Sequence, residues 1–140
     1  MHIIHLNTKS EILAQFSLLQ QLTRELTEDS LSHMLDDMLA HDYRMIGLFE
    51  NETCVAVSGY WLGTKLYSGK YIEMDNVVVA DTHRSKGLGK MLCDEIEKIA
   101  RANGCKHIML DAYVENEKAH AFYEREGFTK RGFHFLKKLW

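Results

Sequence analysis

A short basic segment with two glycines is the part of this sequence best suited to chemistry. It reads Arg84-Ser85-Lys86-Gly87-Leu88-Gly89, and it connects Val77-Val78-Val79 to a stretch with apolar residues at helical spacing. The first amides of a helix lack intrahelical partners, and the helix dipole favours negative charge there. Glycine lets a phosphate approach that backbone closely, and Arg84 and Lys86 add cationic donors. The segment therefore predicts a pyrophosphate cradle, although two glycines at such a junction can also be purely structural.

Two well-known nucleotide-binding motifs do not fit this segment. A dinucleotide-binding G-x-G-x-x-G turn needs a third small residue, but the run that begins at Gly87 ends in Leu92. A phosphate-binding loop of the type G-x-x-x-x-G-K-[ST] needs Ser or Thr after Gly89-Lys90, and the sequence has Met91 there.

The elements that must position this segment follow from the spacing of apolar and turn residues. Thr8 and Glu11 have the spacing of a capping box before a helix, and a second helix begins near Ser30. Asn103-Gly104 is a typical helix stop. Strands are predicted at 2–6, 44–49, 54–62, 71–80, 107–112 and 131–139, and further helices at 88–102 and 116–126.

The predicted order is β-α-α-β-β-β-α-β-α-β, which indicates an α/β fold. Three strands in succession joined by turns must be antiparallel, while the strand–helix–strand unit at 71–112 should be parallel. We therefore expect a mixed, mostly antiparallel sheet flanked by helices. The 140 residues contain no proline, linker or repeat, so a single domain over 1–140 is predicted.

With these elements in place, about residues 71–128 resemble the acetyl-CoA core of the GNAT superfamily of N-acetyltransferases. The valine strand, the R-x-x-G-x-G pattern of Arg84–Gly89 and the long helix stand in the family's order. Asn116 follows, and then Ala121-Phe122-Tyr123-Glu124-Arg125-Glu126-Gly127-Phe128. The first half of the chain matches only in the order of its elements. The resemblance implies the GNAT fold and an acetyltransferase activity with acetyl-CoA as co-substrate.

The resemblance also implies roles for individual residues in binding the cofactor. The backbones of Val77 and Val79 would pair with its pantetheine arm, and backbone N–H groups near Val78 would polarise the acetyl carbonyl. Asn116 would bind the same arm, or it is an ordinary helix N-cap. The amides of one loop would bind the pyrophosphate: Arg84, Ser85, Lys86, Gly87, Leu88, Gly89 and Lys90.

Two catalytic residues are implied in the same way. Tyr123 would protonate the departing CoA thiolate, since a phenol with a pKa near ~10 keeps its proton at neutral pH. Glu73 would be the base that takes a proton from the amine, with Asp75 or a water molecule as alternatives. Asp75 shares its side of the strand with Glu73. The structural alternatives are an aromatic core role for Tyr123 and a solvated strand carboxylate for Glu73.

Composition limits the partners of the protein. A net charge of -3 argues against nucleic acid, and no apolar run is long enough to span a membrane. The cysteines Cys54, Cys93 and Cys105 form no metal-ligand or disulfide pattern, so we expect reduced thiols, a cytoplasmic protein and no metal.

These observations together predict an N-acetyltransferase that transfers acetyl to a primary amine of a small molecule by direct attack in a ternary complex. The first two helices and their loop carry acidic residues that would then attract a cationic acceptor, or that are only the charged outer face of a surface helix: Glu25, Glu28, Asp29, Asp36 and Asp37. Alternatives are acetylation of a protein lysine or N-terminus, or a non-catalytic acyl-CoA-binding module. A homodimer is expected as well, because the last predicted strand carries Phe133, Phe135, Leu136 and Trp140.

Overall fold

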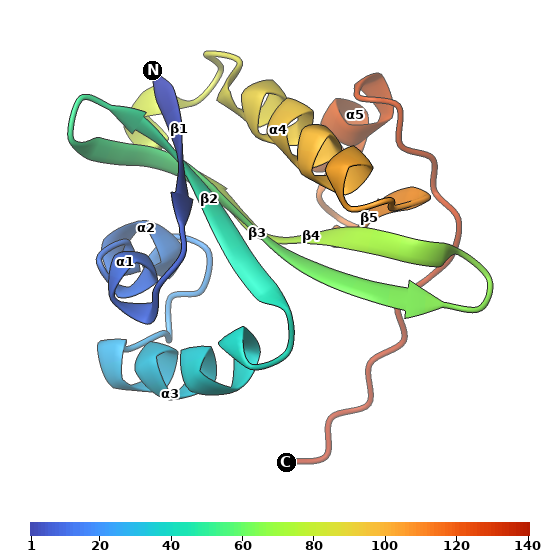
Figure 1. Ribbon diagram of the computed structural model, residues 1–140, viewed down its shortest axis with the longest axis horizontal. Coiled ribbons are helices and arrows are strands. Elements are labelled where there is room, and N and C mark those ends of the chain that lie inside the picture. The colour runs from blue at the N-terminus through green and yellow to red at the C-terminus, as the bar shows by residue number, and fades with distance from the viewer. The chain divides into compact units, whose positions relative to one another are not determined.

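The computed structural model describes residues 1–140, which divide into two compact units, Met1–Leu110 and Asp111–Trp140. The first unit holds a five-stranded sheet with helices on both faces (Figure 1). Its elements are β1 (His2–Leu6), α1 (Lys9–Leu13), α2 (Phe16–Gln20), α3 (Glu28–Leu39), β2 (Tyr43–Glu50), β3 (Thr53–Lys65), β4 (Gly69–Val79), the 3₁₀ turn η1 (Asp81–His83), α4 (Leu88–Ala102) and β5 (His107–Leu110).

The sheet has the strand order β1-β2-β3-β4-β5. The first three pairings are antiparallel, and β4 pairs with β5 in parallel. The α/β fold with a mixed, mostly antiparallel sheet is therefore confirmed. The parallel step is possible because α4 fills the crossover between β4 and β5.

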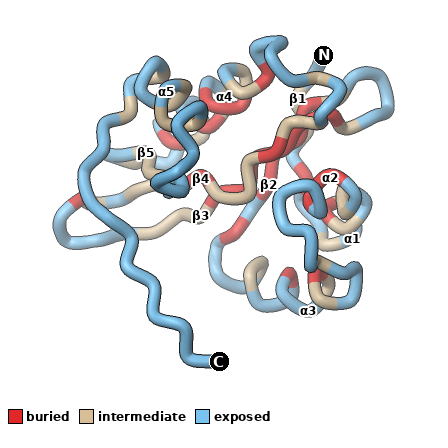
Figure 2. Tube along the Cα trace, turned by 180° about the vertical axis from the view of Figure 1, so that it is seen from behind, coloured by how far each residue is buried: buried red, intermediate tan, exposed pale blue.

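Each face of the sheet is covered by a different set of helices (Figure 1). Alternation along β2 sends Tyr43 and Met45 into the core beneath α1, α2 and α3, together with Ile12 and Leu35. On the other face lies α4, whose buried stripe is Leu88, Leu92, Cys93, Ile96 and Ala100. Figure 2 shows the buried residues concentrated along the central strands and these helix faces.

The N-terminal helical region differs from the prediction of one continuous helix. The capping box of Thr8 and Glu11 is present, but α1 ends at Leu13 and α2 begins at Phe16. Gln15, between them, has φ -100° and ψ 19°, outside the helical range. Ile12, Leu18 and Leu19 still enter the same core. Apolar periodicity thus identified only part of the buried side, since Leu22 of the same spacing is 49% exposed, and it does not report whether the backbone is continuous.

The second unit contains α5 (Glu117–Arg125) and an extended tail. The predicted strand at 131–139 is wrong, because the structure forms no helix or strand after α5. A strand needs a partner edge for its backbone groups, and this unit has no other strand to offer one. The tail's large apolar side chains are exposed (Figure 2), as the 92% exposure of Phe135 illustrates.

Candidate active site

An irregularity in β4 lies directly after the residues that pair with β5. Pairing with β5 covers Tyr71 to Met74 only. On the other side, the register to β3 passes from Gly59↔Asp75 to Val57↔Val78, so Ser58 alone faces two residues of β4. Asn76 occupies the bulge with φ 59°. The extra residue switches the faces of the strand, and Val78 therefore joins the core beneath α1 to α3.

Tyr43 stabilises the bulge through a hydrogen bond with Asn76. Its ring is fully buried, and its hydroxyl accepts a hydrogen bond from Asn76 Nδ2 at 2.9 Å. Gly59 makes room for that hydroxyl, since a Cβ there would overlap the Tyr43 oxygen and lie 2.7 Å from the Asp75 carbonyl oxygen. Burial raises the pKa of Tyr43 above its usual value, so the hydroxyl stays protonated. The sequence offered one signal of this arrangement, a glycine inside a strand.

Two carboxylates and an indole meet beside the bulge. Trp61 is the cross-strand partner of Glu73, and its Nε1–H donates to Asp75 Oδ2 at 2.9 Å. Trp61 also packs on Tyr43, with ring centroids 4.7 Å apart. Glu73 and Asp75 are both half-buried and lie on the same face of β4. The structure therefore assembles a partly desolvated acidic site with an aromatic wall, a combination suited to a cationic amine.

The backbone of β4 after the bulge has one open edge. The Ala80 N–H donates to the Val55 carbonyl of β3 at 2.8 Å. Backbone directions alternate along a strand, so the N–H and C=O of Val79 and the C=O of Val77 point away from β3. Pairing with β5 has already ended at Met74. An extended ligand with amide groups can bind such an edge as an added strand would.

The same alternation distinguishes the amides near Val78. Val78 pairs with Val57, and its own N–H points toward β3. Val79 N–H, by contrast, points to the open edge. Among the backbone donors of Val78 and Val79, only that of Val79 is available to a ligand carbonyl there.

The glycine turn follows this edge after the short 3₁₀ turn η1. After η1, Ser85 and Gly87 adopt positive φ angles of 62° and 79°, and Gly87 is the N-cap of α4. A Cβ on Gly87 would meet no atom within 4 Å, so glycine serves the backbone conformation here rather than a close contact. No side chain caps the helix, and the first bond within it is Met91 N–H to Gly87 O. The amides of Leu88, Gly89 and Lys90 therefore form an uncapped, electropositive helix start.

The cations of this turn are partly neutralised by nearby acids. Arg84 Nη2 lies 2.8 Å from Asp81 Oδ1, and Lys90 Nζ lies 3.3 Å from Asp94 Oδ1. Arg84, Lys86 and Lys90 are all exposed, while the Leu88 side chain is buried and anchors the turn. Exposed cations paired in this way remain able to bind a multivalent anion.

The remaining predicted site residues, Asn116 and Tyr123, belong to the second unit. Asn116 Oδ1 accepts from the Ala119 N–H at 3.2 Å, so the helix N-cap role is confirmed. The Tyr123 ring contacts Phe122 and Phe128 at centroid distances of 5.1 and 5.6 Å, both edge-on. Tyr123 therefore has a small aromatic cluster around its half-buried ring. The cofactor and acid roles of these two residues remain predictions.

Other reactive side chains are engaged elsewhere. His107 and His120 bond the backbone carbonyls of Ser68 and Tyr113, each at 2.8 Å. Burial raises the pKa of the Cys54 thiol to about 11. No group of three or more His, Cys, Asp or Glu is placed to hold a metal ion. None of the helices is long and apolar enough to cross a bilayer.

Proteins of similar sequence or structure are N-acetyltransferases. The chain is 27% identical over 140 residues to the uncharacterised N-acetyltransferase YhdJ of Bacillus subtilis (strain 168), covering 99% of each chain. It is 26% identical over 133 residues to the glucosamine 6-phosphate N-acetyltransferase of Arabidopsis thaliana, covering 91% of this chain and 85% of that protein. An aminoglycoside N-acetyltransferase solved with CoA superposes with a TM-score of 0.84 at 16% identity, covering 99% of this chain and 95% of the other, and so supports the fold.

The family to which the chain belongs follows from a match over most of its length. The family model described as "Acetyltransferase (GNAT) family" matches residues 12–128. That range includes the bulged strand β4, the glycine turn and α5. The chain therefore belongs to the GNAT family and is an acetyl-CoA-dependent acetyltransferase.

Proposed function

We propose that this protein is an N-acetyltransferase that moves an acetyl group from acetyl-CoA to a primary amine of a small molecule, by direct attack in a ternary complex. The observation that carries the proposal is the continuity of the open β4 edge with the uncapped start of α4. The relative named glucosamine 6-phosphate N-acetyltransferase is named for a small amine, which supports the choice of acceptor.

The residues of the first unit fit the two polar parts of such a cofactor. The Val77 and Val79 carbonyls suit the amide N–H groups of the pantetheine arm, because both partners are extended and hydrogen-bonding. The amides from Arg84 to Lys90 suit the pyrophosphate, since Gly87 holds the turn open and no side chain competes for the helix start. Val78, whose side chain is buried, holds the strand in place. Asn116 is assigned to the cofactor arm on the resemblance alone.

The chemistry divides between the protein's acids and bases. Bound acetyl-CoA supplies the thioester whose carbonyl carbon the amine nitrogen attacks, and the carbon–sulfur bond then breaks. Glu73 takes the proton that the ammonium must lose, directly or through water, and Asp75 holds the cation beside it. Val79 N–H donates to the developing oxyanion. On the resemblance alone, Tyr123 is the acid: its phenolic proton goes to the leaving thiolate, and the second proton lost by the attacking nitrogen restores the phenol.

Direct attack is supported by the state of the cysteines. A cysteine that carried the acetyl group would have to be an accessible thiolate. The Cys54 thiol has a pKa of about 11, and Cys93 is buried in the α4 stripe. Cys105 follows the C-terminal end of α4, at the opposite end of this 15-residue helix from the glycine turn.

A thiol-release assay tests the proposal. The protein is incubated with acetyl-CoA and a panel of polyamines, aminoglycosides, amino sugars, amino acids and lysine peptides, and free CoA thiol is followed. We expect turnover with a small amine and a kcat lowered roughly 10²-fold or more by Tyr123→Phe. Tyr113→Phe is the matched control, since Tyr113 is 80% exposed in the same unit and uses only its backbone carbonyl.

Two results would contradict parts of the proposal. Full activity of Tyr123→Phe would remove Tyr123 as the acid. Tight acetyl-CoA binding without thiol release for any amine would instead favour a binding module over an enzyme.

A further inference from the structure

A polar cavity of the first unit lies next to the glycine turn, between α2 and η1. It has a volume of about 710 Å³, within the range of roughly 300–1,000 Å³ found for small-molecule sites. Every lining residue is polar or charged: Ser17, Gln20, Gln21, Arg24, Asp81 and Arg84. A lining without an apolar wall excludes a hydrophobic ligand and favours a strongly hydrogen-bonding one.

The charges of the cavity favour an anion. Arg84 is paired with Asp81 at 2.8 Å, which neutralises the one carboxylate in the lining. Arg24 is exposed and has no ion pair or hydrogen bond. Two guanidinium groups against one carboxylate leave a positive cavity in a chain whose net charge is -3. The acidic residues from Glu25 to Asp37, which are expected to attract a cationic acceptor, do not line this cavity.

The segment that carries Arg24 is closed on itself by hydrogen bonds. Gln20 Nε2 donates to the Leu26 carbonyl at 3.1 Å, and Leu26 N–H donates to the Thr23 carbonyl at 3.1 Å. These bonds bracket Arg24 between two fixed points of the backbone. Arg24 therefore lines the cavity from an ordered turn.

We propose that this cavity is a phosphate monoester site in which Arg24 and Arg84 grip the ligand's terminal phosphate. A dianionic phosphate presents three acceptor oxygens, which suits two guanidinium forks and the donors of Ser17 and Gln21. A carboxylate has only two oxygens and would accept hydrogen bonds from fewer of these donors. The site is separate from the helix amides assigned to the pyrophosphate and shares only Arg84 with that loop. The inference rests on the proposed function, because both candidate ligands belong to the acetyl transfer.

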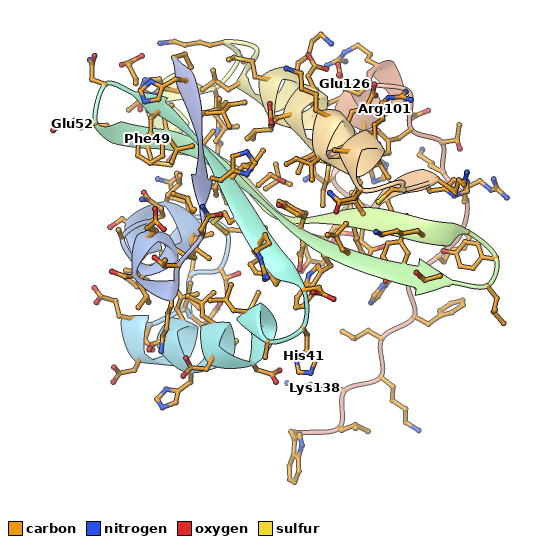
Figure 3. All side chains as sticks on the ribbon, viewed as in Figure 1. His41, Phe49, Glu52, Arg101, Glu126 and Lys138 are labelled. Carbon is orange, nitrogen blue, oxygen red and sulfur yellow. The ribbon has the colours of Figure 1, made fainter.

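Two ligands of that reaction can carry the phosphate. One is the 3′-phosphate of CoA, and the other is a phosphate on the acceptor amine, as in the substrate for which one relative is named. Calorimetry distinguishes them with two matched pairs, CoA against 3′-dephospho-CoA and glucosamine 6-phosphate against glucosamine. Each ligand is titrated into the wild-type protein, Arg24→Gln and Arg101→Gln. Arg101 lies in the last turn of α4 (Figure 3), outside the cavity lining, and is the control.

The expected result is a loss of about tenfold or more in affinity on Arg24→Gln for the phosphate-bearing member of one pair. The other member of that pair should bind the wild type and the variant alike, and Arg101→Gln should match the wild type. The pair that shows the effect identifies the source of the phosphate.

Equal affinities of wild type and Arg24→Gln for all four ligands would overturn the phosphate site. That outcome is separate from failure of the proposed function, which would appear as normal CoA binding without thiol release. Absence of binding by all four ligands would overturn both. Arg24 has no partner in the fold, so the variant is expected to unfold at the wild-type temperature, which circular dichroism checks.

Discussion

Among single residues, Asp75 and Glu73 raise the question of which carboxylate binds the amine and which deprotonates it. The indole of Trp61 fixes one oxygen of Asp75, which leaves the other to hold a cation. We therefore expect Asp75→Asn to raise KM for the amine about tenfold with little change in kcat. Glu73→Gln should instead lower kcat, because Glu73 removes the amine proton as the transition state is reached and not when the amine binds. Steady-state kinetics with the amine found in the thiol-release assay measures both.

Exposed carboxylates provide the comparison for this pair. Glu52 lies in the turn between β2 and β3 (Figure 3), and Glu52→Gln should leave both constants unchanged. A fall in kcat on Asp75→Asn with an unchanged KM would reverse the two assignments. Trp61→Phe should reproduce part of the Asp75→Asn effect, since the ring remains but its N–H donor is lost.

Within the elements, the bulge of β4 depends on a fitted pair, Gly59 and Tyr43. Gly59→Ala is expected to destabilise the protein by about 1–3 kcal/mol, because the added methyl overlaps the Tyr43 hydroxyl. Tyr43→Phe removes that hydroxyl. In a Tyr43→Phe background, Gly59→Ala should therefore lower the free energy of unfolding by less than it does in the wild type. Urea unfolding of the two single variants and the double variant gives the coupling energy.

The rescue should be partial. After the hydroxyl is gone, a Cβ on Gly59 would still lie 2.5 Å from the ring carbon Cζ of residue 43 and 2.7 Å from the Asp75 carbonyl oxygen. Gly132→Ala is the control, since a Cβ there meets nothing within 4 Å. Strictly additive effects of the two substitutions would show that the Tyr43 hydroxyl is not the atom that a Cβ on Gly59 overlaps.

Elements with a strong local signal were predictable from the sequence. The apolar stripe of α4 and its Asn103 stop appear at the predicted positions, as does the Thr8 capping box. The bulge at Asn76 was not predicted, because alternation in β4 is regular on either side of a single inserted residue. The Arg24 cavity was missed for another reason: Gln21 and Asp81 are far apart in the chain and meet only after folding. Periodicity thus located the elements of the site, while tertiary contacts determined its details.

The tail of the second unit exposes large apolar side chains that a partner could cover. Phe133, Phe135 and Trp140 are 80%, 92% and 102% exposed, and their backbone forms no strand. Apolar side chains gathered on an extended, unpaired segment are typical of an interface. A second copy of this chain would offer the tail both a strand edge and an identical apolar segment, since homodimers with twofold symmetry are common. We therefore propose a homodimer formed through residues 131–140.

Light scattering at micromolar concentration measures the molecular mass in solution and so tests for the homodimer. The full chain should have twice the mass of the 16.2 kDa monomer, and a chain ending at Lys130 should be monomeric. Replacing Lys137 and Lys138 (the latter labelled in Figure 3) with Gln serves as the control, because it changes charge in the same tail and keeps the apolar residues. A monomeric mass for the full chain would remove the dimer. A dimeric mass for both chains would place the interface outside the tail, and the exposed Phe135 would then need another explanation.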